Sequence, residues 1–321
     1  MDPSTQQRAK GIAHRVRIKT KKVSAFIILM LVILSFPIKS ISAETVKFKH
    51  IQSVYFDEKG RSLKQPEGVA CNEKSLLIVG DTENDRLLRY NFQEKSLKGG
   101  SEIKIPQLSN PIRLQINSKG EIFALDGKKR RIIRLTPEGA FKGFVDAEGV
   151  PSPSTFIPRG FKIDANNNIY LLDIFTGRVL VLSPEGKYQK QIPFPKDYGF
   201  FSDLSVDSKG SILLIDSVRA MVFSAPKDSN SFSPTTKSLR EYLNFPTSIT
   251  NDNRGTIYIV DENGSGIIIL GQDGSFLGRQ LSMGWNEGFL YYPSQLCVNE
   301  KGEVFIADRG NSRVQIFTLA K

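Results

Sequence analysis

The chain of 321 residues carries a pattern of apolar and polar positions that repeats six times. Each copy is sixteen residues long, has no gap and ends in Asp. The copies span residues 66–81, 111–126, 158–173, 201–216, 246–261 and 293–308. Successive terminal Asp residues lie 45, 47, 43, 45 and 47 positions apart. A period in this range predicts a chain of similar supersecondary units.

Each copy predicts a β-hairpin. Apolar residues at the fourth and sixth positions, such as Leu114 and Ile116, give the period of a strand with one buried face. An Asx such as Asn117 and a residue such as Gly120 follow, and together they suit a tight turn. The continuous apolar run at residues 122–125 is typical of a strand covered on both faces.

A third apolar run follows each Asp, and in several copies a second turn and a weaker fourth strand come next. Four antiparallel strands per roughly 45 residues are typical of a propeller blade. The sixth copy ends after its third strand, whereas an unassigned strand at residues 45–51 precedes the first copy. Pairing that strand onto the last blade would remove an open edge. We therefore predict an all-β, six-bladed β-propeller of four-stranded blades, closed by the N-terminal strand. An open solenoid would leave the strand unexplained.

The pattern of Pro, Asx, an apolar run, Asp and an Arg five positions later resembles the NHL repeat, over residues 44–321. Met221 and Gly266 occupy the Arg position in copies four and five. The other copies keep an Asp and Arg pair: Asp81/Arg86, Asp126/Arg131, Asp173/Arg178 and Asp308/Arg313. We interpret these pairs as clamps on the turn between two strands, so function is expected where the copies differ. The resemblance implies an interaction platform.

Residues 1–43 predict a signal peptide or an N-terminal membrane anchor. A basic segment precedes the uncharged stretch at residues 23–38, and Ala43 offers a cleavage site. Either outcome predicts an exported propeller, periplasmic or extracellular, or membrane-anchored with the propeller outside the cytoplasm. Membrane contact is expected only through residues 23–38, if they are not cleaved.

The formal net charge of +11 lies mostly in this leader. Residues 1–43 contribute +7, and residues 44–321 hold 36 basic and 32 acidic residues, a net charge of +4. This balance gives no support for a nucleic-acid partner. We expect a monomeric propeller.

The two cysteines, Cys71 and Cys297, lie in the first and last copies, which a closed ring makes neighbours. They are one step out of register and so point to opposite sheet faces. We favour two buried free thiols over a disulfide, although export would permit a bridge.

Histidine is scarce: His14 lies in the leader, His50 in the closing strand and none in the six copies. This argues against the metal-assisted, His-rich sites of lyases that the resemblance implies, and against Ser–His catalysis. We assign no catalytic residue, metal ligand or cofactor. Calcium-assisted carboxylate chemistry, as in lactonase-like propellers, stays open.

The early positions of each first strand face the expected channel and vary between copies. The candidate channel-mouth residues are Glu67, Arg113, Arg159, Lys162, Asp203 and Gln295. Mixed charge of this kind suits an anionic group or a peptide, and a solvated channel rim is the alternative. The set of channel-mouth residues lacks the clustered carboxylates that calcium prefers.

Two candidate rim features complete the set. The turn after Asp126 holds Lys128, Lys129, Arg130 and Arg131, and the longest connection between copies holds Trp285. We favour a scaffold in the cell envelope that binds a protein or peptide. The alternatives are a lactonase- or lyase-like envelope enzyme that uses channel carboxylates, and a polyanion or glycan binder that uses the basic turn.

Overall fold

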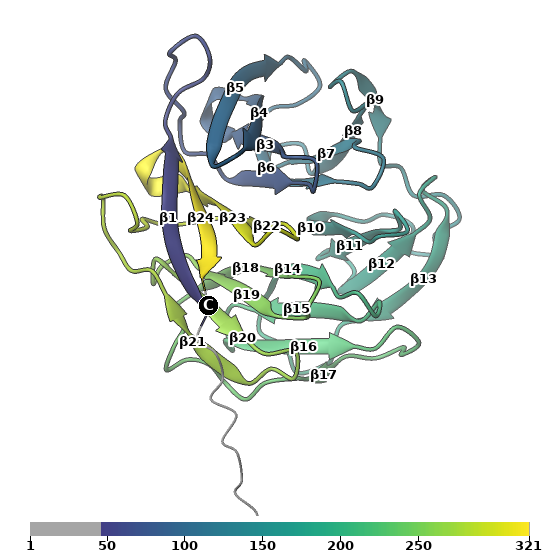
Figure 1. Ribbon diagram of the computed structural model, residues 1–321. Coiled ribbons are helices and arrows are strands. Elements are labelled where there is room, and N and C mark those ends of the chain that lie inside the picture. The colour runs from purple at the N-terminus through teal and green to yellow at the C-terminus, as the bar shows by residue number, and fades with distance from the viewer. Residues whose placement is uncertain (1–45, 321) are drawn as a thin grey trace, which may run out of the picture. The chain divides into compact units, whose positions relative to one another are not determined.

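A computed structural model describes residues 46–320, so the leader lies outside the described residues. The described chain forms six antiparallel four-stranded sheets, which are the blades of a β-propeller (Figure 1). Blade 1 holds β2 (Gly68–Cys71), β3 (Leu76–Asp81), β4 (Arg86–Gln93) and β5 (Ser96–Ile103). Blade 2 holds β6 (Pro111–Ile116), β7 (Ile122–Asp126), β8 (Arg131–Leu135) and β9 (Phe141–Phe144). Blade 3 holds β10 (Pro158–Ile163), β11 (Ile169–Asp173), β12 (Arg178–Leu182) and β13 (Tyr188–Pro193).

The second half of the ring follows the same plan. Blade 4 holds β14 (Phe201–Val206), β15 (Ile212–Asp216), β16 (Met221–Ala225) and the short β17 (Ser233–Pro234). Blade 5 holds β18 (Pro246–Asn251), β19 (Ile257–Asp261), β20 (Gly266–Leu270) and β21 (Phe276–Gln280). Blade 6 takes β22 (Leu296–Val298), β23 (Glu303–Asp308) and β24 (Arg313–Ala320) from the end of the chain. Single turns of 3-10 helix, Thr82–Asn84 and Arg309–Asn311, follow β3 and β23.

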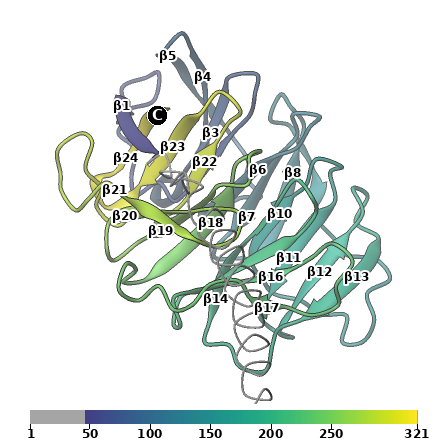
Figure 2. The ribbon, with the colours of Figure 1, turned by 60° about the horizontal axis from the view of Figure 1, so that its bottom comes forward.

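The N-terminal strand completes the last blade, as predicted. β1 (Lys47–Val54) pairs antiparallel with β24, from Lys47 opposite Ala320 to Val54 opposite Val314. Figures 1 and 2 show this pairing from two directions, with purple β1 beside yellow β24. The first strands of neighbouring blades also contact one another around the ring, including β22 with β2. The ring is therefore closed.

Alternate side chains along a strand pack against the two blades on either side. In blade 1, Val69, Leu77 and Val79 pack against blade 6, whereas Ala70 and Ile78 pack against blade 2. Six buried apolar clusters result, one at each blade interface. The apolar runs read from the sequence are continuous because both of their faces are covered.

The predicted Asx turns join the first and second strands of every blade. The side-chain oxygen of Asn117 accepts the backbone N–H groups of Lys119 at 3.0 Å and Glu121 at 2.9 Å. The same two bonds recur at Asn72, Asp164, Asp207, Asp252 and Asn299. Gly120 follows with φ +81°, a conformation that glycine adopts without strain.

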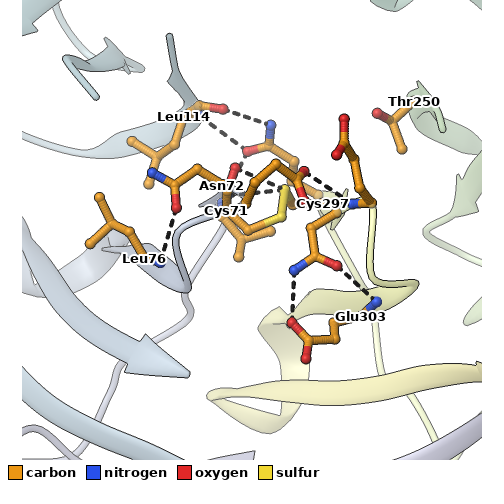
Figure 3. Close-up of a disulfide and its surroundings, with 12 residues drawn as sticks. Cys71, Asn72, Leu76, Leu114, Thr250, Cys297 and Glu303 are labelled. Carbon is orange, nitrogen blue, oxygen red and sulfur yellow. Dashed lines mark hydrogen bonds between the residues drawn. A yellow bond between two sulfur atoms is a disulfide. The ribbon is translucent and has the colours of Figure 1, made fainter. Parts of the chain in front are cut away.

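Cys71 and Cys297 form a disulfide, so the prediction of two free thiols is wrong. Their Cα atoms lie 5.9 Å apart at the interface of blades 1 and 6, where Figure 3 shows the bridge between the two ribbons. The physical reason is the alternation described above. Neighbouring blades pack with opposite sheet faces against each other. Cysteines one step out of register therefore point into the same interface and meet there.

Candidate functional site

The propeller has two faces that differ in their connections. The second strand of each blade ends at its terminal Asp, and the connections to the third strand and to the next blade lie on that side. We call it the Asp face. The Asx turns and the turns between third and fourth strands lie on the opposite side, the turn face. This division follows from the antiparallel strand order of the blades.

Each terminal Asp is buried and anchors the connection that enters its blade. Asp81 accepts the backbone N–H of Lys64 at 2.6 Å, and Asp308 accepts that of Tyr291 at 2.7 Å. Equivalent bonds reach Asp126, Asp173, Asp216 and Asp261. The terminal Asp that the six copies share thus has a structural role, because each carboxylate accepts a backbone N–H that has no backbone acceptor.

Three of the four Asp and Arg pairs form the expected clamp. The Nε–carboxylate distances are 2.7 Å for Arg86–Asp81, 3.2 Å for Arg178–Asp173 and 2.7 Å for Arg313–Asp308. Asp126 and Arg131 do not pair in this way, since the Arg131 guanidinium stacks 3.5 Å from the centre of the Phe144 ring. In blade 5, Arg279 of the fourth strand contacts Asp261 at 2.9 Å instead.

The residues at the third position of each sixteen-residue copy fill the channel. Around the ring small and large residues alternate: Gly68, Arg113, Gly160, Asp203, Ser248 and Gln295. We call this set the third-position layer. Its three large side chains, Arg113, Asp203 and Gln295, are at most 8% exposed. Alternation of small and large residues lets each long side chain cross the space that its neighbour leaves open. The layer closes the channel between the two faces.

Hydrogen bonds fix the large members of this layer. Gln295 accepts the N–H groups of Val69 at 3.0 Å and Leu114 at 3.1 Å, which ties blade 6 to blades 1 and 2. Asp203 accepts the Ser248 hydroxyl at 2.7 Å and the Ile249 N–H at 3.2 Å.

Arg113 crosses the axis and donates to the carbonyl of Thr247 at 3.1 Å and to Ser294 at 3.3 Å. These predicted channel-mouth residues therefore form the floor of the mouth and not its exposed edge.

Burial changes the acid–base behaviour of this interior. It raises the pKa of Asp203, and the positive charge of Arg113 opposes that rise. Burial lowers the pKa of Lys162, which lies two residues deeper than the layer and donates to Thr250 Oγ1 at 3.3 Å. Lys162 thus faces the channel from the turn side, away from the other candidates.

The exposed part of the mouth holds Glu67 and Arg159, at the second positions of their sixteen-residue copies. Glu67 lies 3.8 Å from Arg309, which also contacts Glu262 at 2.6 Å. Arg159 is partly buried with its guanidinium 5.2 Å from the centre of the Phe200 ring. Burial and the positive charges of Arg113 and Arg130 lower its pKa. Sequence reasoning missed Arg309 and Glu262, because they lie in turns that no strand pattern marks.

The predicted rim residues lie on the Asp face but do not form one site. Lys128 pairs with Asp85 at 3.3 Å, and Lys129 donates to the Gln107 carbonyl at 2.9 Å. Trp285 is 76% exposed beside blade 6, with blade 1 between it and the basic turn of blade 2. Arg130 differs from these neighbours: its Nη1 is buried without a partner among residues 46–320, and its positive charge helps to lower the pKa of Arg159 in the mouth.

A group of exposed apolar side chains occupies the Asp face over blades 3 and 4. We call it the apolar rim: Ile174, Phe175, Tyr198 and Val218. Phe175 is 58% and Val218 51% exposed. The sequence carried a signal, because a bulky apolar residue stands one or two positions after the terminal Asp only in copy three, with Ile174 and Phe175, and in copy four, with Val218.

Within residues 46–320, no group of three or more His, Cys, Asp and Glu side chains could hold a metal ion. The same residues contain no helix that is long and apolar enough to span a membrane.

Comparison with known proteins supports the repeat and the fold. The family model described as NHL repeat matches residues 290–317, which contain the whole sixth copy and the first part of β24. No curated protein sequence matches the chain significantly.

Among solved structures, the chain resembles the virginiamycin B lyase of Staphylococcus aureus, with 14% identity, a TM-score of 0.60, and 85% of this chain and 100% of that chain covered. A gluconolactonase of Xanthomonas campestris shows 12% identity and a TM-score of 0.64, with 89% and 94% covered. A chain of a nidogen–laminin complex shows 13% identity and a TM-score of 0.56, with 73% and 92% covered. At these identities the likeness concerns the fold alone.

Proposed function

We propose that this six-bladed propeller with an NHL repeat is a binding scaffold of the cell envelope, which docks a protein or peptide segment on its Asp face. The apolar rim is the observation that carries the proposal. Exposed apolar side chains gathered on one face are typical of interaction sites. The closed channel adds to it, because the third-position layer leaves the Asp face as a continuous floor for an extended segment.

Export is part of the proposal and rests on two features. The leader has the order of charge and hydropathy of a secretion signal. The disulfide between Cys71 and Cys297 is stable in oxidising compartments and rare in the cytosol.

Site-specific photocrosslinking in the native cell tests the docking face. A photoreactive residue in place of Phe175 should yield a defined crosslinked species. Phe141 is the matched control, since it is 40% exposed and begins β9 on the turn face. Equal crosslinking from both positions, or none from Phe175, would contradict docking on the apolar rim.

An envelope enzyme is the second candidate, favoured by the buried Asp203 and the partly buried Lys162 and by the fold shared with a lyase and a gluconolactonase. A histidine-to-alanine variant of that lyase is catalytically inactive, whereas the only histidine here between residues 46 and 320 is His50 in the outer strand β1. Turnover of a lactone that is lost in Glu67→Gln with unchanged thermal stability would establish the enzyme.

A polyanion or glycan binder is the third candidate and would use the basic turn at residues 128–131. Lys128 and Lys129 already have partners there, which leaves less charge for a ligand. Binding that falls steeply with salt and disappears when this turn is neutralised would support it.

A further inference from the structure

The opening of the channel on the Asp face holds several arginine side chains, and some of their N–H groups have no hydrogen-bond acceptor among residues 46–320. Arg113 is 8% exposed, and its Nε is buried with no hydrogen-bond partner among residues 46–320. Nη1 of Arg130 and Oγ1 of Thr247 are likewise buried without a partner in the described chain. Unpartnered buried donors are costly, so a site that holds several of them lacks an acceptor.

The charges of the opening do not balance. Arg309 is engaged by Glu262 and Glu67, and the charge of Arg113 acts on Asp203. This side of the channel holds four arginines and three carboxylates, and the members are Arg113, Arg130, Arg159, Arg309, Glu67, Asp203 and Glu262. Positive side chains outnumber negative ones, which favours an anion.

The accessible members of the cluster are the ones that a ligand would meet. Arg130 and Arg159 are both partly exposed, and Arg113 lies one position deeper on its strand. Burial and two like charges act on Arg159, so an anion beside it would relieve repulsion. The planar guanidinium donates two parallel hydrogen bonds to a carboxylate.

We infer that the Asp-face opening binds a carboxylate of the docked segment, held by Arg130 and Arg159 above the buried Arg113. The inference rests on the proposed function, because it gives the chemical class of a group that the Asp face recognises. Arg159 and part of the apolar rim both belong to blade 3. A docked segment with an apolar side chain next to a carboxylate could therefore contact the apolar rim and Arg159 at once.

Small model compounds test the inference by titration against residues 44–321, followed by NMR. N-acetylphenylalanine offers an apolar ring and a terminal carboxylate, and N-acetylphenylalaninamide lacks only the charge. N-acetylglutamate α-amide offers a side-chain carboxylate, and phenyl phosphate offers a dianion. We expect at least one carboxylate probe to bind with a Kd of about 1 mM and the amide to bind at least about tenfold more weakly.

Two arginine variants locate the binding. Arg159→Gln should weaken binding of the carboxylate about tenfold, and Arg159→Lys should recover only part of it because the ammonium lacks the planar fork. Arg219→Gln is the matched control, since Arg219 is partly exposed on the same face and the charge change is the same. Thermal unfolding of each variant shows whether the fold is retained.

Three results would overturn the inference: equal binding of acid and amide, equal losses in the Arg159 and Arg219 variants, or no carboxylate binding at about 10 mM, tenfold above the expected Kd. Tighter binding of phenyl phosphate would overturn the assignment of a carboxylate. None of these results removes docking on the apolar rim, which the crosslinking at Phe175 tests separately.

Discussion

Glu121 illustrates how a single buried carboxylate stabilises a blade. Its oxygens accept hydrogen bonds from Arg134 at 2.6 Å, Lys142 at 2.5 Å and Asn117 at 2.7 Å. Burial alone would raise the pKa of Glu121, but these bonds outweigh it and lower the pKa to about 2. The residue thus ties the first turn of blade 2 to its third and fourth strands.

Glu121 gives the protein a defined sensitivity to acid. Because the folded pKa lies below the unfolded value, its stabilisation is present above about pH 4.5 and is lost as the pH falls toward 2. The loss should amount to at most about 3 kcal/mol. Urea unfolding at several pH values should show that Glu121→Gln removes this part of the pH dependence, whereas exposed Glu58→Gln leaves it. Identical pH profiles for wild type and Glu121→Gln would contradict the assignment.

Gly160 makes room for Asp203 in the third-position layer. A Cβ at Gly160 would lie 2.9 Å from the Asp203 carboxylate oxygen. Gly160→Ala should therefore destabilise the fold by about 1–3 kcal/mol, as overpacked interiors do. The double variant Gly160→Ala, Asp203→Ser should recover part of this loss, because Ser already serves in the layer at position 248. Calorimetry that finds Gly160→Ala neutral would refute the close contact.

At the scale of elements, β1 is the strand that closes the last blade. Removing residues 44–56 exposes the edge of β24 and the apolar cluster that Val54 helps to cover. We expect the Tm to fall by at least about 10 °C relative to a chain that begins at residue 44. Circular dichroism during heating measures the shift, and an unchanged Tm would mean that β1 does not hold the ring.

Most elements follow from the sequence because strand and turn chemistry is local. The sixteen-residue pattern fixes the first two strands of every blade through alternation, the Asx turn and the terminal Asp. The pairing of β1 with β24 was also predictable, since one strand was missing and one was spare. By contrast, Arg131 stacks on Phe144 rather than joining Asp126, because an aromatic side chain on a neighbouring strand competes for the guanidinium.

The candidate site was less predictable because it depends on side chains from several blades. Sequence variation selected Arg113, Asp203 and Gln295, yet whether they are exposed depends on packing across the channel, as at Gly160, where the missing Cβ leaves room for the Asp203 carboxylate. The disulfide escaped prediction for a related reason. Only the packing of two sheets decides whether opposite faces meet or diverge.

The whole ring is closed twice, once by β1 and once by the disulfide between Cys71 and Cys297, which lie 226 positions apart. Replacing both cysteines by Ser should destabilise the protein by about 2–4 kcal/mol without opening the ring. Combined with removal of residues 44–56, the loss should exceed the sum of the separate losses, because no closure remains. Strictly additive losses in urea unfolding would show that the two closures act independently.

The strand order of blade 6 also determines where the described chain begins and ends. β1 starts at Lys47 opposite Ala320, the last residue of β24, and both lie at the turn-face end of their strands. A tag joined directly before residue 46 or after residue 320 therefore attaches on the side away from the Asp face. Residues 46–320 immobilised through either such tag on a biosensor should present the Asp face to a flowing analyte, so both positions serve equally well for measuring its ligands.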